Sequence, residues 1–190
     1  MLRRTLHAAC LLALCSLPAH AQDAKPGAEE KGAGLVFGKD YAFAVAAPEG
    51  WVFDSESGIQ QGLHAVFYPV GSSWKEGQAV MYVNAAPRAE TLEKFVEGEV
   101  ANFRKGSPRL KVSDEEPPAV AGKQRVVAKR FVEDQLGNFE AVSYIEESKV
   151  VVIFVLSART QGEFDAALPA FRKLVSSYRF ISDKVVTGTK

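Results

Sequence analysis

The segment Val150–Leu156 constrains the fold more than any other part of the chain. All seven residues (VVVIFVL) are apolar and most are β-branched, which favours a strand. Successive side chains of a strand point to opposite faces, so this strand is apolar on both faces and both must be covered. The run is also far shorter than the ~18 apolar residues that a membrane-spanning helix needs. We therefore predict a central strand of a sheet, with a packed layer on each side.

Shorter segments of alternating or apolar character predict the other strands, and turn-forming residues separate them. Residues 138–146 show the clearest alternation, and residues 71–77 (GSSWKEG) form a polar loop between two strands. The acidic, Pro-containing stretch Ser113–Pro118 is predicted to be a loop. The predicted strands are Tyr41–Val45, Trp51–Phe53, Leu63–Val70, Gln78–Ala85, Gln124–Glu133, Asn138–Glu146 and Lys149–Ser157.

Two helices are predicted from apolar residues that recur at helical spacing. The first carries its apolar stripe from Leu92 to Phe103. The second begins at a capping box of Thr160 and Glu163, and its stripe runs from Phe164 to Tyr178. Pro169 lies inside it and removes one backbone hydrogen bond, which predicts a kink or a local break. Strands at hairpin spacing with two helices indicate an α+β fold, an antiparallel β-sheet packed by two main helices.

The first 21 residues have the pattern of a secretory signal peptide. A basic start (Arg3 and Arg4), an apolar run and the small-x-small site 19–21 predict cleavage after Ala21. A lipoprotein signal is disfavoured, because Cys15 follows Leu14 and not a small residue, and because the apolar run before Cys10 is too short. We therefore expect an exported protein, in a bacterial periplasm, with a flexible leader at 22–33, one domain at 34–182 and a C-terminal tail at 183–190.

Cleavage would narrow the chemistry that is open to the mature chain. It would remove Cys10, Cys15, His7 and His20, and would leave His64 as the only histidine. Thiol catalysis, cysteine-based zinc sites and paired-histidine sites are then excluded. Loss of two arginines would leave 21 basic against 23 acidic residues, which gives no electrostatic argument for nucleic acid or an anionic membrane surface. No cofactor or metal site is predicted.

Five short sequence segments, taken together and in their order along the chain, indicate a resemblance to a known family. They are residues 48–51 (PEGW), 67–69 (FYP), 81–84 (MYVN), 91–95 (TLEKF) and 176–180 (SSYRF). Together with the order of elements, they resemble the PsbP-like family, which includes the extrinsic subunit of plant photosystem II and shares its fold with bacterial DcrB-type proteins. The resemblance covers about residues 34–182. It implies an α/β/α sandwich and a binding or assembly role, without a shared catalytic apparatus; no metal ligand of the family can be matched here.

Catalytic motifs are weak in this sequence. Ser72 and Lys75 have the S-x-x-K spacing of penicillin-recognising enzymes, but they lie in a short loop and the S-D-N and K-T-G companion motifs are missing. A Ser-His-Asp triad could use only His64, which is predicted within a strand, and no G-x-S-x-G motif accompanies it.

Aromatic residues near turns are the better candidates for a functional surface. Tryptophan and tyrosine are frequent in recognition surfaces, and here they flank the polar loop 71–77. The candidate binding residues are Trp51, His64, Tyr68, Ser72, Ser73 and Trp74. We predict a non-catalytic, exported protein that binds another cell-envelope protein, with no membrane segment in the mature chain. A small secreted hydrolase that uses carboxylates or the Ser72 and Lys75 pair, or a carrier of a small apolar ligand held between sheet and helix, is the alternative. The oligomeric state is left open.

Overall fold

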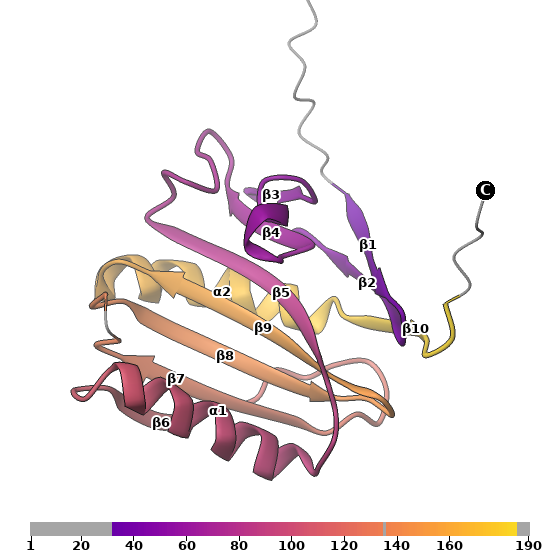
Figure 1. Ribbon diagram of the computed structural model, residues 1–190. Coiled ribbons are helices and arrows are strands. Elements are labelled where there is room, and N and C mark those ends of the chain that lie inside the picture. The colour runs from indigo at the N-terminus through magenta and orange to yellow at the C-terminus, as the bar shows by residue number, and fades with distance from the viewer. Residues whose placement is uncertain (1–31, 135, 186–190) are drawn as a thin grey trace, which may run out of the picture.

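The structure, a computed structural model, describes residues 32–134 and 136–185 and contains two antiparallel sheets and two long helices (Figure 1). The predicted signal peptide at 1–21, almost all of the predicted leader at 22–33 and residues 186–190 of the predicted tail lie outside the described residues. Among the described residues, no helix is both long enough and apolar enough to cross a membrane.

The larger sheet has seven strands, and each is antiparallel to its neighbours. The strand predicted to be central is the fourth of the seven, which confirms the prediction. In spatial order the strands are β3 (Trp51–Asp54), β4 (Ala65–Pro69), β5 (Ala79–Pro87), β9 (Val150–Ala158), β8 (Phe139–Glu146), β7 (Val126–Val132) and β6 (Lys111–Glu115).

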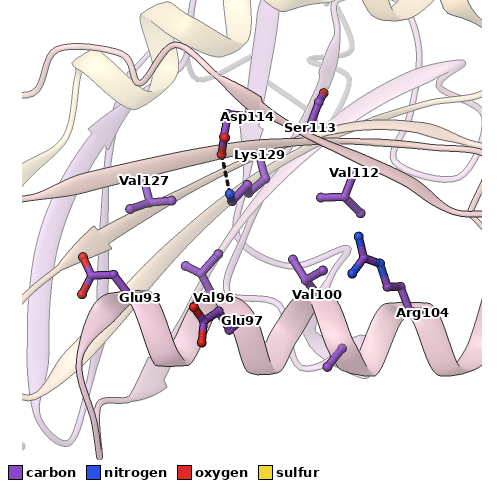
Figure 2. Close-up of a pocket in the computed structure, with 11 residues that line it drawn as sticks. Glu93, Val96, Glu97, Val100, Arg104, Val112, Ser113, Asp114, Val127 and Lys129 are labelled. Carbon is purple, nitrogen blue, oxygen red and sulfur yellow. Dashed lines mark hydrogen bonds and ion pairs between the residues drawn. The ribbon is translucent and has the colours of Figure 1, made fainter.

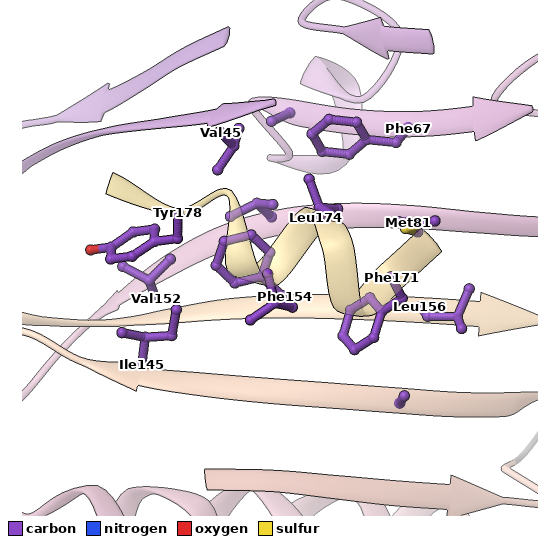
Figure 3. Packing of buried hydrophobic residues seen from close by; sticks show 14 of the residues in the cluster. Val45, Phe67, Met81, Ile145, Val152, Phe154, Leu156, Phe171, Leu174 and Tyr178 are labelled. Atoms are coloured by element: carbon purple, nitrogen blue, oxygen red, sulfur yellow. The ribbon is translucent and has the colours of Figure 1, made fainter. Parts of the chain in front are cut away.

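The two helices cover opposite faces of this sheet. Helix α2 (Gln161–Ser176) packs on the face that carries Val152, Phe154 and Leu156 of β9, each 0% exposed (Figure 3). Helix α1 (Leu92–Gly106) packs on the face that carries Val151 and Val155. The apolar residues of β9 are thus shared between two cores, and the result is an α/β/α sandwich.

The helix boundaries follow from local side-chain chemistry. Thr91 caps α1 through its side chain, which accepts from the Lys94 N–H at 3.4 Å. Thr160 caps α2: its hydroxyl accepts from the Glu163 N–H at 3.3 Å and donates to the Glu163 carboxylate at 2.9 Å. Half of the predicted capping box therefore forms: Thr160 caps the Glu163 N–H, but the Glu163 carboxylate accepts from the Thr160 hydroxyl and not from a backbone N–H. Pro169 does not end α2, which continues to Ser176.

The smaller sheet joins the two ends of the domain. It consists of β1 (Ala33–Gly38), β2 (Tyr41–Ala46) and β10 (Arg179–Ser182), with β2 in the middle. Its inner face packs into the same core as α2 through Val36, Phe43 and Val45, which are at most 2% exposed. The Ser177 hydroxyl accepts from the Ala46 N–H at 2.9 Å and fastens the end of α2 to β2.

Three predicted boundaries are wrong. The predicted loop 113–118 begins as strand: β6 pairs with β7 over residues 111–115, because an edge strand needs only one partner and tolerates polar side chains. His64, predicted within a strand, lies in a bend, since β4 begins at Ala65. Residues 179–182, which carried no strand prediction, form β10 because β2 offers them a free edge.

Candidate functional site

Trp74 is fixed at the centre of the loop between β4 and β5. Its indole N–H donates to the Gln61 side-chain oxygen at 3.1 Å, which ties this loop to the loop between β3 and β4. Its ring stands edge-on to that of Tyr82 in β5, with 6.2 Å between the ring centroids and 86° between the planes. Trp74 is half-buried. Because a hydrogen bond and a neighbouring ring already hold the Trp74 side chain, it has little conformational freedom left to lose on binding.

Tyr68 lies on the same face of the sheet as Tyr82. Residue Phe67, its neighbour in β4, points into the α2-side core, so strand alternation turns Tyr68 to the opposite face. The Tyr68 hydroxyl donates to the Asp54 carboxylate at 3.0 Å. Burial and this hydrogen bond to a carboxylate raise the pKa of Tyr68, so the hydroxyl stays protonated.

The Asp54 carboxylate accepts several hydrogen bonds at the end of β3. Besides the bond from Tyr68, it accepts from the N–H groups of Glu56 and Ser57 at 2.7 and 2.9 Å, and from the Ser57 hydroxyl at 2.6 Å. Partial burial works to raise the pKa of Asp54, but these hydrogen bonds outweigh it and hold the pKa below its usual value. The carboxylate therefore acts as a charged acceptor that orders the loop before η1 (Ile59–Gln61) and fixes the Tyr68 ring.

The structure does not bring all six predicted binding residues together. Trp51 in β3 packs against the α2-side core, on the opposite face from Tyr68 and Trp74. Ser72 lines a hollow with Trp51 beside α2. Ser73 and His64 lie in the two loops that Trp74 and Gln61 connect, and His64 is exposed. We refer to Gln61, Tyr68, Trp74 and Tyr82 as the Trp74 surface.

The Ser72 and Lys75 pair lacks the arrangement that a serine hydrolase needs. Both residues are exposed in the loop between β4 and β5, where no helix is present to set Ser72 against Lys75. The hydrogen bonds of this loop link other residues: the Ser73 hydroxyl bonds the Glu76 carboxylate and accepts from the Glu76 N–H, both at 3.3 Å. Within the part of the chain that the structure describes, the Ser72 hydroxyl forms no hydrogen bond with a base.

Glu140 in β8 is a buried carboxyl that the sequence reasoning missed. It is 7% exposed, and it lies on the α1 face together with Val142 and Tyr144. Burial raises the pKa of Glu140 to about 7, despite a hydrogen bond with Ser157 that works the other way, and Asp134 adds a smaller upward contribution. Burial raises the pKa of the Tyr82 hydroxyl, and the Glu140 carboxylate adds a smaller upward contribution. The sequence held a signal for this burial, because strand alternation places Glu140 on the same face as the apolar residues Val142 and Tyr144.

A groove of about 640 Å³ lies between α1 and the strands β6 and β7 (Figure 2). Its floor is apolar and consists of Val96 and Val100 from the helix with Val112 and Val127 from the strands. An ion pair between Lys129 and Asp114 crosses its upper wall. This groove occupies the position, between sheet and helix, where the carrier hypothesis placed a ligand. Within residues 32–134 and 136–185, no group of His, Cys, Asp or Glu side chains is arranged to hold a metal ion.

Comparison with known proteins identifies the fold but not a family. No protein-family model matches the sequence, and no curated protein matches it. A solved structure with the same fold is that of cyanobacterial PsbP (CyanoP) from Synechocystis sp. PCC 6803, determined in solution. The TM-score is 0.50 at 14% sequence identity, and the match covers 84% of this chain and 99% of CyanoP. The comparison confirms the predicted α+β fold and its PsbP-like arrangement; at this identity the likeness is one of fold.

Proposed function

We propose that this chain is a non-catalytic protein, exported to the bacterial periplasm, that binds another protein of the cell envelope through the Trp74 surface. The observation that carries the proposal is the hydrogen bond from Trp74 to Gln61, which holds a half-buried tryptophan beside Tyr82. Tyrosine and tryptophan dominate the energetic centres of protein interfaces. Tyr68, held by Asp54, extends the same surface.

The remaining predicted residues have different places in this proposal. Ser73 and His64 flank the Trp74 surface and supply polar groups at its rim, where solvent remains accessible. Trp51 and Ser72 lie on the other face and are left out of the contact. The likeness of fold to CyanoP supports the class of architecture on which this surface is built.

The experiment is affinity capture of the tagged protein from its own cell envelope after brief crosslinking, followed by a binding titration with the purified captured protein. Trp74→Ala removes the central ring, and we expect it to weaken binding at least tenfold, about 1.4 kcal/mol or more, as for an interface hot spot. Gln61→Ala removes only the hydrogen bond that holds the indole and should give a smaller loss.

The matched control is Leu35→Ala, which removes a large apolar side chain that is 57% exposed in β1 of the small sheet, away from Trp74. Binding that is unchanged by Trp74→Ala, or that is reduced equally by the control, would contradict the proposal. So would a capture that recovers no protein specifically.

The groove between α1 and β6 supports a second candidate function, the carrier of a small apolar ligand. Its volume lies within the usual range for ligand sites, ~300–1,000 Å³, and four valines form its floor. Native mass spectrometry of the purified protein tests this directly: a mass above that of the sequence, lost on Val100→Glu, would support it. The hydrolase alternative predicts turnover of an ester panel that Ser72→Ala abolishes.

A further inference from the structure

The outer face of the small sheet is apolar although no layer of the described chain covers it. Val36 in β1 points into the core, so its neighbours Leu35 and Phe37 point outward, where they are 57% and 50% exposed. Ile181, the extra residue at the bulge in β10, is 56% exposed. Three of the six large hydrophobic side chains exposed in the described chain therefore belong to this one sheet.

Small residues separate these large side chains. Leu35 and Arg179 lie opposite Ala44, and Phe37 and Ser182 lie opposite Ala42. The middle strand β2 thus forms a shallow, alanine-floored strip, and the large side chains stand on the flanking strands. Side chains that protrude in this way from a flat face can insert together into a deformable surface such as a lipid bilayer. Figure 1 shows β1, β2 and β10 at one end of the molecule, beside the large sheet.

Basic side chains border the apolar residues. Lys39 lies in the turn after Phe37, and Lys184 follows Ser182 at the same end, since β10 runs antiparallel to β2; both lysines are exposed. Neither forms an ion pair with any residue that the structure describes. Arg179 is exposed in the same row as Leu35, and its guanidinium donates to the Tyr178 and Ser176 carbonyls at 2.6 and 2.9 Å.

The acidic residues at this end already have a cationic partner. The Lys149 ammonium lies 3.7 Å from the Asp40 carboxylate and 4.0 Å from that of Asp183, and it donates to the Asp183 carbonyl at 2.8 Å. Asp183 also accepts from the Ser148 hydroxyl at 3.1 Å. The charge that remains beside Phe37 and Ile181 is therefore positive.

We propose that the outer face of the small sheet docks on an anionic phospholipid bilayer. Apolar side chains enter the boundary between headgroups and acyl chains, and Lys39, Lys184 and Arg179 attract the headgroup phosphates. Apolar insertion alone or electrostatic attraction alone gives weak membrane binding, and the two together give a stable association. The near-neutral charge of the whole chain conceals this arrangement, because only the local excess acts within the ~8–10 Å over which salt screens charges.

A bilayer fits these observations better than a protein partner. The face offers protruding apolar side chains on a flat sheet, with cations at its rim. Among the residues described there, both carboxylates, Asp40 and Asp183, lie within ion-pair distance of Lys149. A specific protein interface instead needs a central pocket or knob with matched polar partners around it. A second copy of this chain would present the same cations, and the like charges would repel.

The test is co-sedimentation with vesicles. The protein is purified from cells that express the full chain, and its intact mass records the first residue. We expect binding to phosphatidylcholine vesicles that contain phosphatidylglycerol, much weaker binding to phosphatidylcholine alone, and loss of binding at high salt. The double variant K39E/K184E should bind the anionic vesicles roughly tenfold or more weakly, from the electrostatic contribution of each lysine.

A second pair of variants separates the apolar contribution. F37S/I181S should weaken binding comparably, whereas Ile59→Ser should not, although Ile59 is also 56% exposed and lies in the loop before β4. Circular dichroism confirms that each variant is folded. Equal binding by all variants, or no preference for anionic vesicles, would overturn the proposal. A dimer in sedimentation velocity that F37S/I181S dissolves would also overturn it, in favour of a second copy as the occupant.

Discussion

Glu140 should make the stability of this protein depend on pH, in the direction opposite to that of most carboxyl groups. Its pKa is about 7 in the folded state against 4.5 in the unfolded chain. Between these values the folded protein holds a proton that the unfolded chain has released. The contribution of Glu140 to the free energy of unfolding is therefore fully present below pH 4.5 and is lost as the pH rises through about 7.

The magnitude follows from the size of the shift. One unit of pKa difference is equivalent to ~1.4 kcal/mol, so the interval from 4.5 to about 7 gives a loss of about 3 kcal/mol. Glu140→Gln keeps the shape and polarity of the protonated side chain and removes its titration. We expect the variant to match the wild type near pH 4.5 and to exceed its stability by up to about 3 kcal/mol at pH 8.

The assay is urea unfolding followed by tryptophan fluorescence, at a series of pH values from acid to mildly alkaline. Other groups titrate in both proteins, so the difference between wild type and variant isolates Glu140. Glu97→Gln is the control, because it changes a carboxyl to an amide at an exposed position of α1 and should keep the wild-type step. A difference between wild type and Glu140→Gln that stays constant with pH would refute the reasoning.

Three further substitutions test how the core is held. Tyr178→Phe removes the hydroxyl that donates to the buried Glu147 carboxylate at 2.8 Å, and should cost about 1–3 kcal/mol in urea unfolding at neutral pH. Thr160→Ala removes the cap of α2 and should cost about 1 kcal/mol by the same measurement. Phe171→Ala, at a position 2% exposed, should cost about 3–5 kcal/mol and lower the thermal midpoint most of the three. A loss below about 1 kcal/mol at Phe171 would show that the α2-side core relaxes around the cavity.

The parts of the fold that the sequence predicts are those in which local pattern and tertiary environment agree. An all-apolar strand can lie only between two layers, so β9 was placed correctly from its residues alone. The Thr160 cap and the apolar stripes of α1 and α2 carry their own signals in the same way. The polar strand β6 has no such signal, because pairing with β7 stabilises it more than its own composition does.

The candidate site was harder to predict because it depends on which face of the sheet each strand presents. Trp51 and Trp74 both flank turns in the sequence, yet the first packs toward α2 and the second stands against Tyr82 on the other face. A pattern of alternation says which residues share a face but not which helix covers that face. The burial of Glu140, which is 7% exposed, has the same origin, since alternation along β8 does not say how closely its face of the sheet is covered.

The position of β9 has a consequence for how the chain reaches its native state. Its two neighbours in the sheet, β5 and β8, are complete by residue 146, but neither can pair on its inner edge until residues 150–158 are present. The contacts between β5 and β9 join residues more than sixty positions apart, and such distant closure makes folding slow. A shortened chain that ends before Val150 would leave one edge of β5 and one edge of β8 unpaired, and it would also lack α2 and β10. We therefore expect the two halves of the large sheet to join only late in folding, because the middle strand follows both of its neighbours in the sequence.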